Sequence, residues 1–261
     1  MEQHQFKKQF GQNFLKDEYW AMSLVKSAEI KSEDIVFEIG AGQGIVTKEL
    51  AKYAKKVYAL DIDTSLIGFL EKMFKGSPNV EILNQDILTW DFLKVIKDKK
   101  YKVVSSLPYN VAKKILRIFL TSINSPEVIS VIIQKEVADN YLAQPPKSTF
   151  LSNFVNIYAD VNFIEDIPSY AFYPEPKVQS AIICIKKHKV KYQEPNKLLS
   201  FIKLGYANPR KMLLNNVASS LKKPKEEVAA LFKDSKIDLK SRPENLSLDK
   251  WQTLYTKATS C

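Results

Sequence analysis

The first residues of this chain that could do chemistry are Gly40, Gly42 and Gly44, three of only seven glycines. They lie between an apolar run that predicts a strand and a pattern that predicts a helix. Glycine lets the backbone turn tightly and approach a ligand closely, with a helix N-terminus behind it. An ordinary structural turn is the alternative interpretation. We expect this loop to cradle a nucleoside-containing cofactor.

Two acids strengthen this prediction, because Asp61 and Asp86 stand at the ends of the next two predicted strands. An acid at the second strand end is placed to bind ribose hydroxyls. An Asp after the third can accept a hydrogen bond from an adenine amino group. The loop spacing is G-x-G-x-G, whereas nicotinamide-dependent dehydrogenases have G-x-G-x-x-G. The spacing resembles class I S-adenosylmethionine methyltransferases, which implies S-adenosyl-L-methionine as the cofactor.

A further candidate loop, Ser106-Leu107-Pro108-Tyr109, follows the fourth predicted strand. It resembles the [Asn/Asp/Ser]-x-Pro-[Tyr/Phe] motif of methyltransferases that act on exocyclic amines of bases. Adenine N6 is a poor nucleophile, because its lone pair is delocalised into the ring. The Ser106 side chain and the Leu107 carbonyl would accept its two N–H groups and free that lone pair, while Tyr109 stacks on the flipped base. We count Ser106 among the cofactor-binding residues as well; a plain turn is the alternative.

These loops need a scaffold that places successive strand ends together. Short apolar runs alternate with helical patterns, which predicts an α/β fold, the class I methyltransferase (Rossmann-like) sheet, parallel and covered on both faces. The predicted strands are 34–39, 56–61, 80–83, 102–105, 127–134 and 182–185, and the predicted helices are 46–53, 65–74, 111–120, 198–206, 211–221, 225–232 and 248–255. We predict a methyltransferase domain over residues 1–190 and a small all-α, RNA-binding C-terminal domain over 191–261.

Composition narrows the class of protein. The net charge of +10 favours a polyanionic partner, although a solvated lysine-rich surface explains it equally well. The two cysteines have no CxxC spacing and the two histidines are isolated, so we expect no metal site and no histidine base. No apolar run approaches the roughly 20 residues that span a bilayer. We therefore expect a cytoplasmic protein with no membrane partner, and a monomer by default.

Nearly the whole chain resembles the small-subunit (16S-type) ribosomal RNA adenine N6,N6-dimethyltransferase family. Five stretches carry the resemblance besides the loops above: residues 8–15, residues 134–138 after the fifth predicted strand, the F-x-P-x-P-x-V-x-S-A run at 172–181, the R-K-x-L-x-N stretch at 210–216 and the R-P-E-x-L-S stretch at 241–247. The resemblance implies that Asn13 and Leu15 line the cofactor pocket and that Phe172 flanks the target base opposite Tyr109. This chain departs from the family at Ser106, where the family usually has Asn.

The resemblance implies dimethylation of N6 on two adjacent adenines in a 3′-terminal hairpin of small-subunit rRNA, within an assembling subunit. Lys113, Lys114, Arg210 and Lys211 are the candidate RNA contacts. One alternative is a large-subunit rRNA adenine methyltransferase of the macrolide-resistance type, against which the R-P-E-x-L-S stretch argues. Another is a noncatalytic RNA-binding assembly factor, an alternative that Ser106 keeps open.

Overall fold

The structure, a computed structural model, describes residues 13–97 and 99–259. The chain forms two compact units, one of residues Met1–Ala138 and Asn162–Lys187, the other of residues Asp139–Val161 and His188–Cys261. A single boundary near residue 190 therefore differs from the observed division, because the segment 139–161 joins the second unit. The reason is a core contact: Ile157 packs in one apolar cluster with Leu198 and Trp251. Of the described helices, none is both long and apolar enough to cross a membrane.

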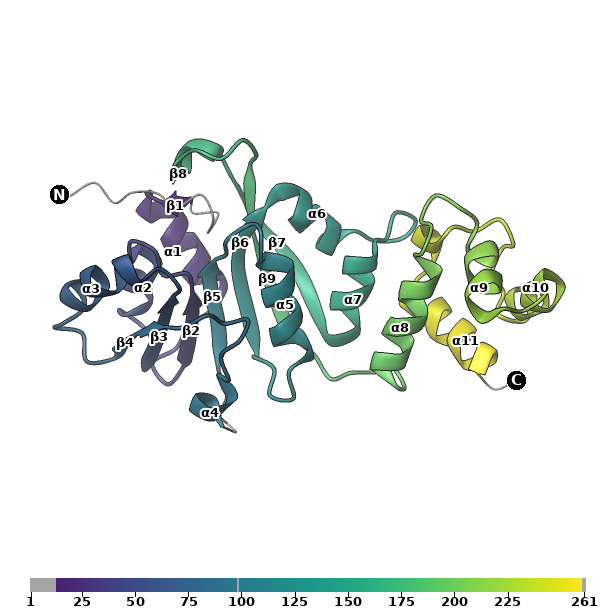
Figure 1. Ribbon diagram of the computed structural model, residues 1–261, viewed down its shortest axis with the longest axis horizontal. Coiled ribbons are helices and arrows are strands. Elements are labelled where there is room, and N and C mark those ends of the chain that lie inside the picture. Colours follow the sequence, from purple (N-terminus) through teal and green to yellow (C-terminus); the bar gives the residue numbers. More distant parts are fainter. Residues whose placement is uncertain (1–12, 98, 260–261) are drawn as a thin grey trace. The chain divides into compact units, whose positions relative to one another are not determined.

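The first unit contains most of a seven-stranded sheet of order β4-β3-β2-β5-β6-β9-β7 (Figure 1). Its strands are β2 (Ile35–Ile39), β3 (Lys56–Asp61), β4 (Val80–Asn84), β5 (Lys102–Ser106), β6 (Val128–Gln134), β7 (Ala159–Ile167) and β9 (Ser180–Lys187). The pairs β3–β4, β2–β3, β2–β5 and β5–β6 are parallel, as predicted. The pair β6–β9 is antiparallel, so the sheet is mixed rather than wholly parallel.

Both faces of the sheet are covered. Successive residues of each strand point to opposite faces, so each strand contributes side chains to both apolar layers. Val36, Val104 and Ile132 face one apolar cluster, which α1 (Glu18–Ser27), α2 (Ile45–Leu50) and α3 (Thr64–Met73) complete. Phe37, one position after Val36, faces the other side and meets Phe92 and Tyr101 edge-on. There Phe119 of α5 (Ala112–Thr121) packs on Phe92, 5.2 Å between ring centroids. The short helix α4 (Leu93–Ile96) follows Phe92.

A two-stranded ladder adds the N-terminal segment to this unit. Strand β1 (Phe14–Leu15) pairs antiparallel with β8 (Phe172–Tyr173), so that Leu15 lies opposite Phe172 and Phe14 opposite Tyr173. Residues 8–12 of the predicted N-terminal signature lie outside the described residues. The strands β1, β7 and β8 and the helices α1, α4, α6 (Lys135–Leu142) and α7 (Phe150–Tyr158) were not among the predicted elements. The other strands and α-helices were predicted, with ends that agree or differ by up to four residues.

The second unit is helical around a core of its own. Its remaining helices are α8 (Pro195–Gly205), α9 (Leu213–Leu221), α10 (Lys225–Asp234) and α11 (Leu248–Thr259). Trp251 is fully buried at the centre and stacks on Tyr206, 6.0 Å between ring centroids. Gly205 leaves room for that indole, since a Cβ there would lie 2.3 Å from a Trp251 ring atom.

Candidate active site

The glycine loop follows β2 and turns directly over the end of β3. The N–H groups of Gly40 and Ala41 both donate to the Leu60 carbonyl, at 2.7 and 2.9 Å. Gly40, Gly42 and Gly44 all have positive φ, at 77°, 57° and 80°, which residues with a side chain adopt only with strain. The loop therefore needs glycine for its path, as the spacing predicted.

Asp61, the last residue of β3, ties that loop to the neighbouring strand. One carboxylate oxygen accepts from the Gly42 N–H at 2.8 Å, and the other accepts from the Asp63 N–H at 2.9 Å. Burial raises the pKa of this carboxyl, while hydrogen bonds from the backbone lower it. Each carboxylate oxygen retains further acceptor capacity for a ligand hydroxyl.

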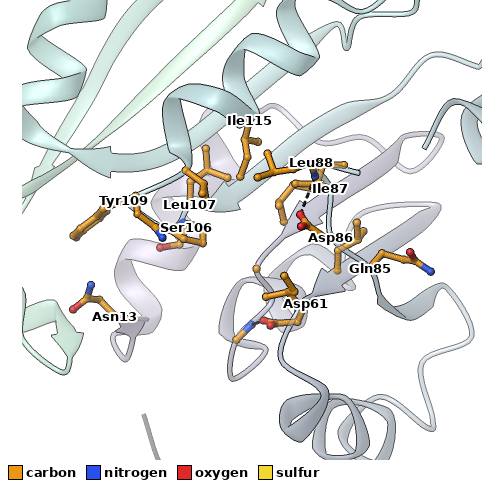
Figure 2. A pocket seen from close by; sticks show the side chains of 18 of the residues that line it. Asn13, Asp61, Gln85, Asp86, Ile87, Leu88, Ser106, Leu107, Tyr109 and Ile115 are labelled. Carbon is orange, nitrogen blue, oxygen red and sulfur yellow. Dashed lines mark hydrogen bonds between the residues drawn. The ribbon is translucent and has the colours of Figure 1, made fainter. Parts of the chain in front are cut away.

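A pocket of about 280 Å³ opens at this edge of the sheet. It brings together residues that are more than a hundred positions apart at the extremes: Asn13, Phe14, Ile39, Gly40, Gly42, Leu60, Asp61, Ile62, Gln85, Asp86, Ile87, Leu88, Ser106, Leu107, Pro108, Tyr109, Asn110, Val111 and Ile115. Figure 2 shows Asp61 and Asp86 on one side of the pocket and Ser106, Tyr109 and Asn13 on the other. Asp86 accepts from the Leu88 N–H at 2.9 Å, which orients its carboxylate.

The serine loop forms the wall opposite the two acids. Ser106 ends β5, and the Leu107 N–H donates to the Ile132 carbonyl at 3.1 Å, which fixes the peptide that follows. Ser105 donates its hydroxyl to the Ile39 carbonyl at 2.5 Å. By contrast, no described residue bonds to the Ser106 hydroxyl, which lines the pocket. A Cβ at Gly40 would lie 3.5 Å from Pro108, so the glycine and serine loops are in contact.

Tyr109 is held by a residue that is distant in sequence. Its hydroxyl and the Ser180 hydroxyl are 2.5 Å apart, and Ser180 is fully buried at the first position of β9. Burial raises the pKa of the Tyr109 phenol, so the ring is neutral near pH 7.

Three of the predicted site residues do not line the pocket. Leu15 and Phe172 face each other across the β1–β8 ladder, and their side chains are buried in the apolar core at 4% and 1% exposure. Gly44 is the N-cap residue of α2, and a Cβ there would meet Phe74 at 3.0 Å. These positions serve packing in the observed structure, because β-pairing and helix contacts turn them away from the cavity. The other predicted pocket residues all line it.

The predicted RNA contacts are on the surface of their units. Lys113 and Lys114 are exposed in the first turn of α5, next to the pocket residue Val111. Arg210 and Lys211 are exposed in the turn that precedes α9, in the second unit.

Sequence reasoning missed the apolar walls of the pocket. Ile62 and Ile87 each directly follow one of the two acids, and both line the cavity. Ile62 is 46% exposed, so its side chain is open to contact with a ligand in the pocket. An apolar residue directly after each strand-end acid was the available signal. Together they make a slot with apolar faces and polar ends, the form that suits an adenosine group.

Behind the glycine loop lies a buried acid, Glu38, which accepts from the Thr47 hydroxyl at 2.5 Å. Burial raises its pKa to about 8, opposed by the hydrogen bonds from Thr47 and assisted by the charge of Asp61. Because the Glu38 carboxyl holds its proton more tightly in the folded state, this group stabilises the fold at acidic pH. That contribution is lost as pH rises from 4.5, the ordinary value, towards about 8.

We predict that Glu38→Gln flattens the pH dependence of stability. In this window the wild type should lose up to about 1.4 kcal/mol of unfolding free energy per pH unit more than the variant does. Urea unfolding at pH 5, 6, 7 and 8 measures the difference. Glu71→Gln, at an exposed position of α3, is the control and should follow the wild type. Parallel curves for wild type and Glu38→Gln would contradict the prediction.

Comparison with known proteins adds to this geometry. The family model of ribosomal RNA adenine dimethylase matches residues 3–260. The chain belongs to this family. Proteins named ribosomal RNA small subunit methyltransferase A are 34% identical in Dehalococcoides mccartyi and 35% in Clostridioides difficile; each match covers 95% of this chain and 87% and 89% of the relative.

Two solved structures have the same fold as this chain. A dimethyladenosine transferase from Plasmodium falciparum superposes with a TM-score of 0.82 at 22% identity, covering 95% of this chain and 98% of that one. The 23S rRNA methyltransferase ErmE superposes with a TM-score of 0.77 at 23% identity, covering 94% and 99%. Family and fold are those of S-adenosylmethionine-dependent methyltransferases, and the pocket with two strand-end acids, a glycine-rich loop and apolar walls fits that cofactor.

Proposed function

We propose that this protein transfers methyl groups from S-adenosyl-L-methionine to N6 of two adjacent adenines in a 3′-terminal hairpin of small-subunit rRNA. The observation that carries the proposal is the meeting of the serine loop and the two strand-end acids around one pocket. The proposal is also supported by relatives named ribosomal RNA small subunit methyltransferase A, which are 34–35% identical along 95% of this chain.

In this proposal the donor lies in the acid side of the pocket. Asp61 would accept from the ribose hydroxyls and Asp86 from the adenine amino group, while Ile62 and Ile87 would cover the faces of the base. Gly40 and Gly42 let the backbone approach the methionine part, beside Asn13. When bound, S-adenosylmethionine supplies an electrophilic methyl group on a sulfonium.

The serine loop prepares the acceptor. The Ser106 hydroxyl and the Leu107 carbonyl accept the two N–H groups of adenine N6, and this draws its lone pair out of the ring. Tyr109 stacks on the base beside Pro108 and holds it in line with the methyl group, and such alignment supplies most of the catalysis. The nitrogen would form a bond to the methyl carbon as the bond from that carbon to sulfur breaks, with S-adenosylhomocysteine as the leaving group, and it would lose one proton to solvent. Because the nitrogen attacks with its lone pair and loses its proton afterwards, no general base is required before transfer.

RNA contacts complete the proposal. Lys113 and Lys114, beside the pocket, neutralise phosphates near the target adenines, and Arg210 and Lys211 of the helical second unit contact phosphates elsewhere. The role of Phe172 beside the base stays a prediction, because its side chain would first have to leave the core. We also propose that the protein acts as a monomer, in the cytoplasm, on a partly assembled small subunit.

The deciding experiment is to incubate the purified protein with labelled S-adenosylmethionine and unmethylated small subunits, then digest the RNA and analyse its nucleosides by mass spectrometry. We expect N6,N6-dimethyladenosine. A parallel incubation with protein-free large-subunit rRNA tests the macrolide-resistance alternative. Bound donor without methyl transfer to either RNA would contradict the proposal and favour a noncatalytic assembly factor.

A further inference from the structure

The Tyr109 ring has a support outside its own loop. Tyr109 comes directly after Pro108 in the turn that leads into α5, where the Val111 N–H donates to the Pro108 carbonyl at 3.2 Å. Its side chain is half-buried and lines the pocket, while its hydroxyl meets the Ser180 hydroxyl at 2.5 Å. The far end of the ring is therefore attached to a different part of the fold.

Ser180 is a rigid attachment point. It is fully buried and begins β9, where it lies opposite Gln134 at the end of β6. The preceding residue, Gln179, accepts from the Lys135 N–H at 2.9 Å, so the backbone is held on both sides of this position. A ring joined to a buried sheet residue at one end and to a proline-led turn at the other has little freedom in either side-chain torsion.

We propose that Ser180 is a positioning residue, which presets the plane of the Tyr109 ring for the stacked base. The inference rests on the proposed function for its kinetic consequence, and on geometry alone for the ring orientation. A base that stacks on a preset ring does not have to restrict the rotation of the ring as it binds. Without the Ser180 hydroxyl, the ring would sample other orientations before each productive encounter.

A double-mutant cycle tests the coupling. Ser180→Ala and Tyr109→Phe each remove one of the two hydroxyls, and each should lower kcat/KM for the RNA by about five- to tenfold, the effect of freeing one ordered side chain. The double variant should be no slower than either single one, because both changes break the same contact. The KM for S-adenosylmethionine should stay within about twofold, since one side-chain orientation facing the acceptor is all that changes.

Ser130→Ala is the matched control. Ser130 is also fully buried, lies on β6 opposite Cys184 of β9, and bonds to Ser27 and to the Leu24 carbonyl, away from the pocket. It should lower the melting temperature as Ser180→Ala does, with kcat/KM unchanged. Additive losses in the double variant, or equal kinetic losses in Ser130→Ala and Ser180→Ala, would overturn the proposal.

A second readout needs no methyl transfer. In protein labelled with 3-fluorotyrosine, the ¹⁹F resonance that disappears in Tyr109→Phe identifies Tyr109. Ser180→Ala should shift this resonance, whereas Ser130→Ala should leave it in place. If the wild type methylates no RNA but the shift is seen, the proposed function fails and the positioning role stands. An unmoved resonance in Ser180→Ala would refute the positioning role, whatever the activity.

Discussion

Ser106→Ala is expected to lower kcat for methyl transfer by about a hundredfold, the usual loss when one preorganised hydrogen-bonding group at a reacting centre is removed. The hydroxyl lines the pocket and no described residue bonds to it, so it is free to accept a hydrogen bond from N6. Single-turnover methylation with saturating donor and RNA measures the effect. Calorimetry on the same variant measures the Kd for S-adenosylmethionine.

This pair of measurements separates the two roles predicted for Ser106. A loss in kcat with Kd within threefold of wild type assigns the residue to the acceptor amine, whereas a weaker Kd assigns it to the cofactor. Ser105→Ala is the neighbouring control: its hydroxyl bonds to the Ile39 carbonyl, so its main loss should be about 1–3 kcal/mol of stability. Ser106→Asn, which restores the usual family residue, should recover activity over Ser106→Ala. Unchanged kcat in Ser106→Ala would remove Ser106 from the mechanism.

Gly42→Ala is expected to weaken S-adenosylmethionine binding by about a hundredfold or more, equivalent to about 2.7 kcal/mol. Two effects act together. The φ of +57° is strained for alanine by about 1–2 kcal/mol. The new Cβ would also lie 2.8 Å from a ring carbon of Phe14, too close for any real contact. Relief of that clash must move Phe14 or the loop, and both line the pocket.

Isothermal titration of the folded variant measures this change in Kd. Gly68→Ala is the control within α3, since a Cβ there has no neighbour within 4 Å. It should leave Kd unchanged and raise stability by about 0.5–1 kcal/mol, because alanine is the better helix former. A Gly42→Ala protein that binds the donor within threefold of wild type would show that the loop does not hold the cofactor.

The parallel strands of the sheet were predictable because each is a short apolar run. Tertiary context leaves such a run few alternatives to a buried strand. The strand Lys56–Asp61 was predicted to the residue, and β2, β4, β5 and β6 within one residue at either end. The elements that were missed carry weaker patterns. β7, for example, alternates apolar and polar residues only over its first five positions and is mostly exposed, so its pattern is weaker than that of the apolar strands.

The site residues likewise divide into those that could be placed from the sequence and those that could not. Residues that stand at strand ends, such as Asp61 and Asp86, could be placed because parallel strands bring their carboxyl ends to one edge of a sheet. Leu15, Gly44 and Phe172 could not be placed, because their orientation depends on a two-residue ladder and on a helix contact. Neither leaves a periodic pattern in the chain.

Local pattern alone therefore predicted the glycine loop, the serine loop and the parallel strands that present them. These depend on backbone conformation and on sequence spacing within single loops, which the residue types themselves restrict. Only the tertiary structure decided which side chains reach the pocket, that segment 139–161 belongs with the C-terminal helices, and that Ser180 holds Tyr109. These contacts join residues that are tens of positions apart in the sequence. They therefore form only when the chain between those residues has folded.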